Sequence, residues 1–142
     1  MRVDSAGNVG IGVTPAATWS DRTVLQIGGN LTLLAKTAQA AGNQTVLAQN
    51  TSFDTSADWI YQSTDEASYY DQRNGCHFWY TAPSGTAGND ITFTERMSID
   101  EAGIIFTGAE TANANMSGGG LTLDQNAADN EILAFKSSDV TH

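Results

Sequence analysis

The stretch "MRVDSAG", residues 1–7, returns later in the chain as "MSIDEAG", residues 97–103, with Met, a β-branched residue, Asp, Ala and Gly in the same places. Two more pairs follow in the same order: "GGNLTL" (28–33) with "GGGLTL" (118–123), and "VLAQNTS" (46–52) with "ILAFKSS" (132–138). The offset between the copies falls from 96 to 90 to 86 residues. Loop deletions between retained strands would produce this shrinkage, because loops tolerate length changes better than paired strands do.

The order of these matches divides the chain into two parts. Residues 1–96 form a full β repeat unit with an aromatic-rich insertion at about 53–90, and residues 97–142 form a truncated second copy of the repeat. Repeated units that stack on their neighbours build elongated assemblies. We therefore expect an elongated structural protein and not an enzyme.

The glycines of the first copy raise the question of a phosphate-binding loop. When the copies are aligned on Gly7 and Gly103, Gly10 corresponds to Phe106. A phosphate cradle needs glycine where the backbone approaches the anion, so Phe would block it. We interpret Gly7, Gly10, Gly12 and Gly103 as turn glycines, at positions that require positive φ or a close approach of two chain segments.

The composition excludes several classes of partner. The 142-residue chain carries 16 acidic and 6 basic residues, a net charge of -10. Nucleic acid and anionic membrane surfaces both bind clustered Lys or Arg, so we expect neither as a partner. No apolar stretch approaches the roughly 20 residues of a membrane span, so we expect no membrane insertion. The single cysteine excludes an internal disulfide.

Period-two alternation predicts an all-β fold of short strands and hairpins. In "ITFTERMSID", residues 91–100, alternation places Ile91, Phe93, Met97 and Ile99 on one face of a half-buried strand. Eight other short apolar or β-branched runs are bounded by Gly, Asn, Asp or Ser. They are "TVLQIG", "LTLLAK", "QTVLAQ", "DWIYQS", "CHFWYT", "GIIFTG", "LTLD" and "EILAFK".

Two segments interrupt this pattern. Thr14 and Pro15 suit the cap and first position of a helix, which predicts one short helical turn near Pro15. The Pro, Gly and Ser residues of "TAPSGTAGND", residues 81–90, predict a long turn between neighbouring strands.

An elongated array of strands leaves unpaired edges that invite association. Winding three chains around a common axis closes those edges and covers the apolar stripe that a single chain would expose. We therefore expect an elongated fibre that is an intertwined homotrimer.

Four segments carry a family resemblance: "RVDSAGNVGIGVTP", "WSDRTVLQIGG", "HFWYTAPSGTAGNDITFTERMSID" and "EILAFKSSDVTH". In this order they resemble segments of tailed-bacteriophage tail-fibre and tail-spike proteins, particularly those with repetitive β-structured shafts. The resemblance implies a homotrimeric viral structural protein that works in host adhesion, located in the virion tail or outside the cell.

We expect no catalytic residue, no cofactor and no metal site. Cys76 and His77 are neighbours on a predicted strand, so their side chains point to opposite faces and do not pair. Consecutive acids such as Asp65 and Glu66 diverge in the same way. The loop "DQNAADNE", residues 124–131, has oxygen ligands but lacks the glycine of an EF-hand loop, which leaves cation binding there open.

Aromatic residues are the candidate binding site. Six of them concentrate in the insertion of the full unit: Trp59, Tyr61, Tyr69, Tyr70, Trp79 and Tyr80. Exposed aromatic faces stack on sugar rings, which favours contact with a host cell-surface glycan, whereas buried ones would fill the core of a bulge or a chain interface. Alternation predicts Phe78 and Tyr80 on one side of their strand and Trp79 on the other.

The sequence thus favours a non-enzymatic structural and adhesive segment of a phage-like tail fibre. One alternative is a self-assembling extracellular filament subunit that polymerises end to end, because the terminal half-repeat offers a surface like one inside the full unit. Another is a fragment of a polysaccharide depolymerase tail spike, an enzyme class that uses paired acids.

Overall fold

A computed structural model describes residues 1–16, 19, 21–37, 42–53, 56, 58–108 and 120–122 of the chain. This part contains strands and no helix, so the all-β prediction is confirmed. The strands are β1 (Arg2–Val3), β2 (Val9–Ile11), β3 (Arg22–Ile27), β4 (Leu31–Lys36), β5 (Gln44–Gln49), β6 (Thr51–Phe53), β7 (Trp59–Tyr61), β8 (Asp65–Arg73), β9 (Cys76–Gly85), β10 (Thr94–Ile99), β11 (Ile104–Thr107) and β12 (Gly120–Thr122). Among these residues no helix could cross a membrane.

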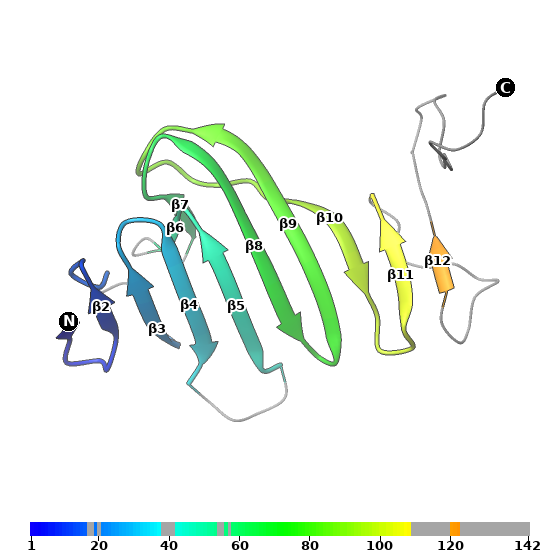
Figure 1. Ribbon diagram of the computed structural model, residues 1–142, viewed down its shortest axis with the longest axis horizontal. Coiled ribbons are helices and arrows are strands. Elements are labelled where there is room, and N and C mark those ends of the chain that lie inside the picture. The colour runs from blue at the N-terminus through cyan, green and yellow to red at the C-terminus, as the bar shows by residue number, and fades with distance from the viewer. Residues whose placement is uncertain are drawn as a thin grey trace, which may run out of the picture.

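Ten strands form one mixed sheet whose order, β1-β2-β3-β4-β5-β8-β9-β10-β11-β12, follows the chain. The sheet therefore grows in one direction from the N-terminal hairpin to β12, as the colours of Figure 1 show. Most neighbours pair antiparallel, whereas β2 pairs parallel with β3 and β11 pairs parallel with β12. The hairpin β6–β7 leaves the sheet after β5 and forms a second, two-stranded sheet.

The repeated stretch folds into the same hairpin twice. In β1–β2 and in β10–β11, the Asp side chain, Asp4 or Asp100, accepts hydrogen bonds from the backbone N–H groups two and four residues further on. The glycines of the two turns have similar positive φ, 85° at Gly7 and 80° at Gly103. Each hairpin is followed by a strand that pairs parallel with its second strand. Hairpin and parallel strand are thus the structural unit that the sequence repeats.

Two of the glycines assigned to turns have different roles. Gly12 follows β2 with a φ of 73°, whereas Gly10 lies inside β2 and not in a turn; it meets the other predicted condition, a close approach of two chain segments. A Cβ atom at Gly10 would lie 2.2 Å from the carbonyl oxygen of Val13 and 2.8 Å from Cδ of Pro15. The glycine is required because the chain folds back closely over the strand.

The helical turn predicted near Pro15 is absent from the described residues of that segment, Thr14–Ala16. The backbone N–H of Ala16 instead donates to Oε1 of Gln26, at 2.8 Å. The segment thus uses this donor to attach to β3. Residues 17, 18 and 20, which belong to the same prediction, lie outside the described part of the chain.

The second copy of the repeat is described only in part. Its hairpin β10–β11 and the short β12 are described, whereas residues 109–119 and 123–142 are not. The predicted strand "EILAFK" and the candidate cation ligands at 124–131 therefore lie outside the described residues.

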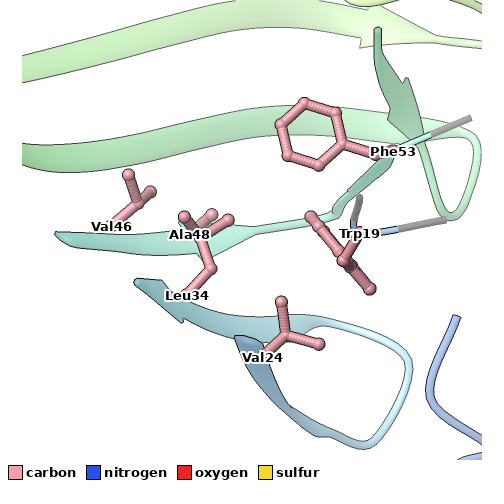
Figure 2. Packing of buried hydrophobic residues seen from close by; sticks show 6 residues of the cluster. All are labelled: Trp19, Val24, Leu34, Val46, Ala48 and Phe53. Atoms are coloured by element: carbon pink, nitrogen blue, oxygen red, sulfur yellow. The ribbon is translucent and has the colours of Figure 1, made fainter. Parts of the chain in front are cut away.

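The large sheet has an inner and an outer face. We call inner the face that carries Val24, Leu34 and Val46 and that packs against the β6–β7 hairpin; the opposite face is outer. The side chains of the inner face converge on the aromatic rings of Trp19 and Phe53 (Figure 2). The buried cluster consists of Trp19, Val24, Leu34, Val46, Ala48 and Phe53. This core covers the inner face of the sheet at β3–β5.

A bulge in β10 makes the predicted face of residues 91–100 wrong. The register with β9 shifts between Glu95 and Met97, so one extra residue interrupts the alternation. Phe93 consequently packs edge-on against Tyr69 on the inner face, with ring centroids 4.6 Å apart. Met97 instead pairs with Trp79, and its side chain lies on the outer face.

The turn predicted at 81–90 begins later than expected, because β9 continues to Gly85. Tyr61 contributes to this extension, since its hydroxyl donates to the carbonyl oxygen of Pro83 at 2.6 Å. A Cβ atom at Gly85 would lie 2.1 Å from the Tyr61 ring. The strand therefore extends along the β6–β7 layer, which supports it.

Candidate functional site

The six candidate aromatics do not form one site. Their strand positions divide them between the faces of the large sheet and the β6–β7 layer. On the inner side lie Trp59, Tyr61, Tyr69 and Tyr80; on the outer face lie Tyr70 and Trp79. Tyr80 and Trp79 lie on opposite faces, as the alternation of their strand predicts.

The inner set packs the β6–β7 hairpin onto the sheet. Tyr69 stacks between Trp59 and Tyr80, with centroid distances of 5.2 and 4.4 Å. Burial raises the pKa of the Tyr69 hydroxyl and, to a smaller extent, the pKa of the Tyr80 hydroxyl. Tyr61 is only 6% exposed. These rings contribute to the core, so we do not assign them to ligand binding.

The outer set includes a third ring that the sequence did not identify. Tyr70 and Trp79 are cross-strand partners with ring centroids 5.0 Å apart. His77 lies two residues before Trp79 on the same face, and its Nδ1 forms a hydrogen bond with the Tyr70 hydroxyl. The three rings form an aromatic platform on the outer face. Sequence reasoning considered His77 only as a partner for Cys76 and so missed it.

The platform belongs to a longer row of apolar side chains, which we call the outer row. Each member is the cross-strand partner of the next, and each is exposed or half-buried. The outer row consists of Val3, Val9, Leu25, Leu33, Leu47, Tyr70, Trp79 and Met97. It crosses eight consecutive strands, from β1 to β10, at right angles to them.

The rows on either side of the outer row have no charged residues. One consists of Ile11, Ile27, Leu31, Gln49, Ser68, Thr81 and Thr94. The other consists of Thr23, Ala35, Thr45, Gln72, His77, Ile99 and Ile105. Arg96, at the bulge of β10, reaches the margin of this surface, where its Nε donates to the Thr81 hydroxyl at 2.9 Å.

The outer face is open enough to receive a partner. Leu33 is 38% exposed and Leu47 is 46% exposed. A shallow hollow of about 400 Å³ lies beside Leu47, Tyr70 and Trp79. Contiguous apolar patches larger than a few hundred Å² mark interaction sites on soluble proteins. The arrangement suits an uncharged contact surface better than a catalytic cleft.

The inner face, in contrast, holds a charged network. Asp71 is fully buried; its Oδ2 accepts a hydrogen bond from Nε2 of Gln44 at 2.9 Å and lies 3.4 Å from a guanidinium nitrogen of Arg73. Arg73 also donates to the Tyr80 hydroxyl, which donates in turn to Glu95. Oδ1 of Asp71 has no hydrogen-bond partner within the described part of the chain. Burial therefore raises the pKa of this carboxyl, although Gln44 and Arg73 act in the opposite direction.

We expect the substitution Asp71→Asn to change how stability depends on pH. Because the folded-state pKa is raised, the folded chain holds this proton more tightly than the unfolded chain. The contribution of Asp71 to stability therefore falls as pH rises from the unfolded pKa, about 3.9, through the folded value, and is constant above it. Urea unfolding at several pH values measures this effect. The free energy of unfolding of Asp71→Asn, relative to that of wild type, should rise over that pH range. A difference between Asp71→Asn and wild type that does not change with pH would contradict the assignment.

The described residues bring together few groups that could carry chemistry. No cluster of three His, Cys, Asp or Glu side chains that could hold a metal ion occurs among them. Cys76 lies beside Arg73 on the inner face, and its thiol contacts the carbonyl of Asn74. Comparisons with protein-family models, with curated proteins and with solved structures find no match for this chain.

Proposed function

We propose that this protein is a non-enzymatic structural and adhesive segment of a fibre like those of phage tails, assembled as a homotrimer. The observation that carries the proposal is the repeated hairpin with its parallel strand, present near both ends of one sheet whose strands follow the chain order. Such a sheet lengthens along one axis as units are added, which suits a shaft. The resemblance of four segments to tail-fibre proteins supports the same function and a place in the virion tail or outside the cell.

Attachment to a host surface is the adhesive part of the proposal. A host cell-surface glycan remains the proposed partner. Of the candidate aromatics, Tyr70 and Trp79 lie on the outer face, which the assembly inferred below covers, so we assign them to the chain interface and not to the glycan. Stacking on sugar rings requires an accessible aromatic face. Binding of the purified chain to host cells, competed by their isolated surface polysaccharide, tests this part separately from assembly.

Sedimentation velocity and negative-stain electron microscopy of the purified full chain test the assembly. We expect a discrete trimer that is longer than it is wide. A monomer at the highest soluble concentration would contradict the proposal. Release of reducing sugars from capsular polysaccharide would contradict the non-enzymatic assignment and favour a depolymerase.

One observation favours a second candidate, a filament subunit that polymerises end to end. β10 pairs with β11 along one edge and with β9 along the other. Its counterpart in the first copy, β1, pairs with β2 alone and forms an edge of the described sheet. An edge strand can accept a strand from another molecule. Long filaments in the micrographs would favour this candidate over the discrete trimer.

A further inference from the structure

We infer that the outer face is the surface on which copies of this chain pack against one another, in parallel and in register, with their outer rows facing a common axis. This inference rests on the proposed function, because it names the partner of the assembly and the surface that binds it. Three observations carry it: the distribution of charge, the direction of the outer row, and the size of the face.

The charge distribution favours another copy of the same chain. With a net charge of -10, two copies repel each other over most of their surface. The paired positions of the outer row and of its two neighbouring rows carry no Asp, Glu, Lys or Arg. The buried Asp71 and its partner Arg73 lie on the inner face instead. Apart from Arg96 at its margin, the outer face is thus where acidic copies can approach without like charges facing one another.

The direction of the outer row determines how the copies are aligned. The row runs along the hydrogen-bonding direction of the sheet, which is also the direction in which the repeat extends the chain. The outer rows of parallel copies therefore remain in contact over their whole length. Each residue of the row then contacts the same residue of the neighbouring copy. Because β-sheets twist, such copies wind around their shared axis.

The size of the face matches that of a stable interface. Ten strands spaced about 4.8 Å apart give a length of about 43 Å, and five residues per strand at about 3.3 Å give a width of about 17 Å. The area is about 700 Å², close to the roughly 800 Å² that each partner buries in a stable complex.

Cross-linking tests the register directly. In a Cys76→Ser background, Leu25→Cys, Leu47→Cys and Met97→Cys each leave one cysteine per chain, spaced along the outer row. Packed sheets lie about 10 Å apart, so a bismaleimide of that span should link like residues at all three positions. In a trimer it should leave one chain of each assembly unlinked.

Two further cross-linking results test separately which face the copies share and whether they run parallel. Lys36→Cys is exposed on the inner side of β4 and should link poorly. Links at the central Leu47→Cys without links at Leu25→Cys or Met97→Cys would indicate antiparallel packing and overturn the parallel register.

Substitution tests the surface itself. Leu33→Gln combined with Leu47→Gln should weaken association by more than about tenfold in sedimentation equilibrium, because two apolar side chains of each copy lose their contact. Ala35→Gln with Thr45→Gln, in the neighbouring row at the flank of the same surface, removes less apolar area and should weaken association less. Circular dichroism verifies that both variants fold.

The outcomes distinguish this inference from the proposed function. If the wild type forms trimers but the glutamine variants and the cross-links show no preference for the outer row, the surface is wrong and the fibre assembly stands. If the wild type remains monomeric, both are overturned. A monomer that co-floats with neutral phosphatidylcholine vesicles would assign the outer face to lipid.

Discussion

Replacing Asn50 with Ala should lower the free energy of unfolding by about 4 kcal/mol, since buried groups that lose their partners cost about 1–3 kcal/mol each. Asn50 is 1% exposed and lies where the chain leaves β5 for the β6–β7 hairpin. Its Nδ2 donates to the carbonyl oxygens of Ser63 and Glu66, at 3.1 and 2.9 Å. Its Oδ1 accepts from the backbone N–H and the hydroxyl of Ser63, both at 2.8 Å. Alanine would leave these groups unpaired.

Asn74 is a matched control for the backbone part of this effect. Both residues have positive φ, 56° at Asn50 and 52° at Asn74, which alanine adopts at a cost of about 1 kcal/mol or slightly more. Asn74, however, lies in the exposed turn between β8 and β9. Asn74→Ala should therefore cost only the backbone part in urea unfolding at one fixed protein concentration. Equal losses for the two variants would show that the side chain of Asn50 contributes nothing.

The second large effect is expected for Phe53→Ala, which should cost about 3–5 kcal/mol, as for other buried aromatics truncated to Ala. The ring is 4% exposed and meets Trp19 edge-on and Trp59 at a tilt, with centroid distances of 4.8 and 4.3 Å. The guanidinium of Arg22 lies 4.8 Å from its centroid. Removing the ring leaves a cavity between the β6–β7 layer and the sheet.

Phe53→Leu separates the loss of aromatic contacts from the loss of volume. Leucine retains much of the apolar volume, so its cost should be about 1–2 kcal/mol. Urea unfolding followed by tryptophan fluorescence measures both variants, and hydrogen exchange should show the β6–β7 strands opening first in Phe53→Ala. Full protection of these strands in that variant would mean that Phe53 does not attach the hairpin.

The structural layer around Phe53 bears on assembly as well. Because β6–β7 covers the inner face at β3–β5, the leucines of the same strands that point outward, such as Leu33 and Leu47, are left for a partner. Loss of the hairpin would expose a second apolar face. Phe53→Ala should then increase irregular aggregation without abolishing contacts between outer faces.

Several features of the fold could be predicted from local sequence. The hairpin at residues 1–12 and its counterpart at 97–108 have the same turn chemistry, because an Asp followed three residues later by Gly satisfies the backbone donors of the turn locally.

The strand β8 was missed, since "DEASYYDQR" begins with two acids and has no β-branched residue. Its pairing with β5 and β9 stabilises it regardless of weak local propensity.

The sequence by itself determined the repeat, the all-β class and the two sides of most strands, because turn chemistry and alternation depend on near neighbours. Only the tertiary structure decided that Tyr70 and Trp79 face outward together with Leu33 and Leu47, while Tyr69 stacks in the core. Alternation gives each strand two faces, but it does not specify which strands are neighbours, in what register, or which face the inserted hairpin covers. Those choices depend on contacts between residues far apart in the chain, and they create the uncharged outer row.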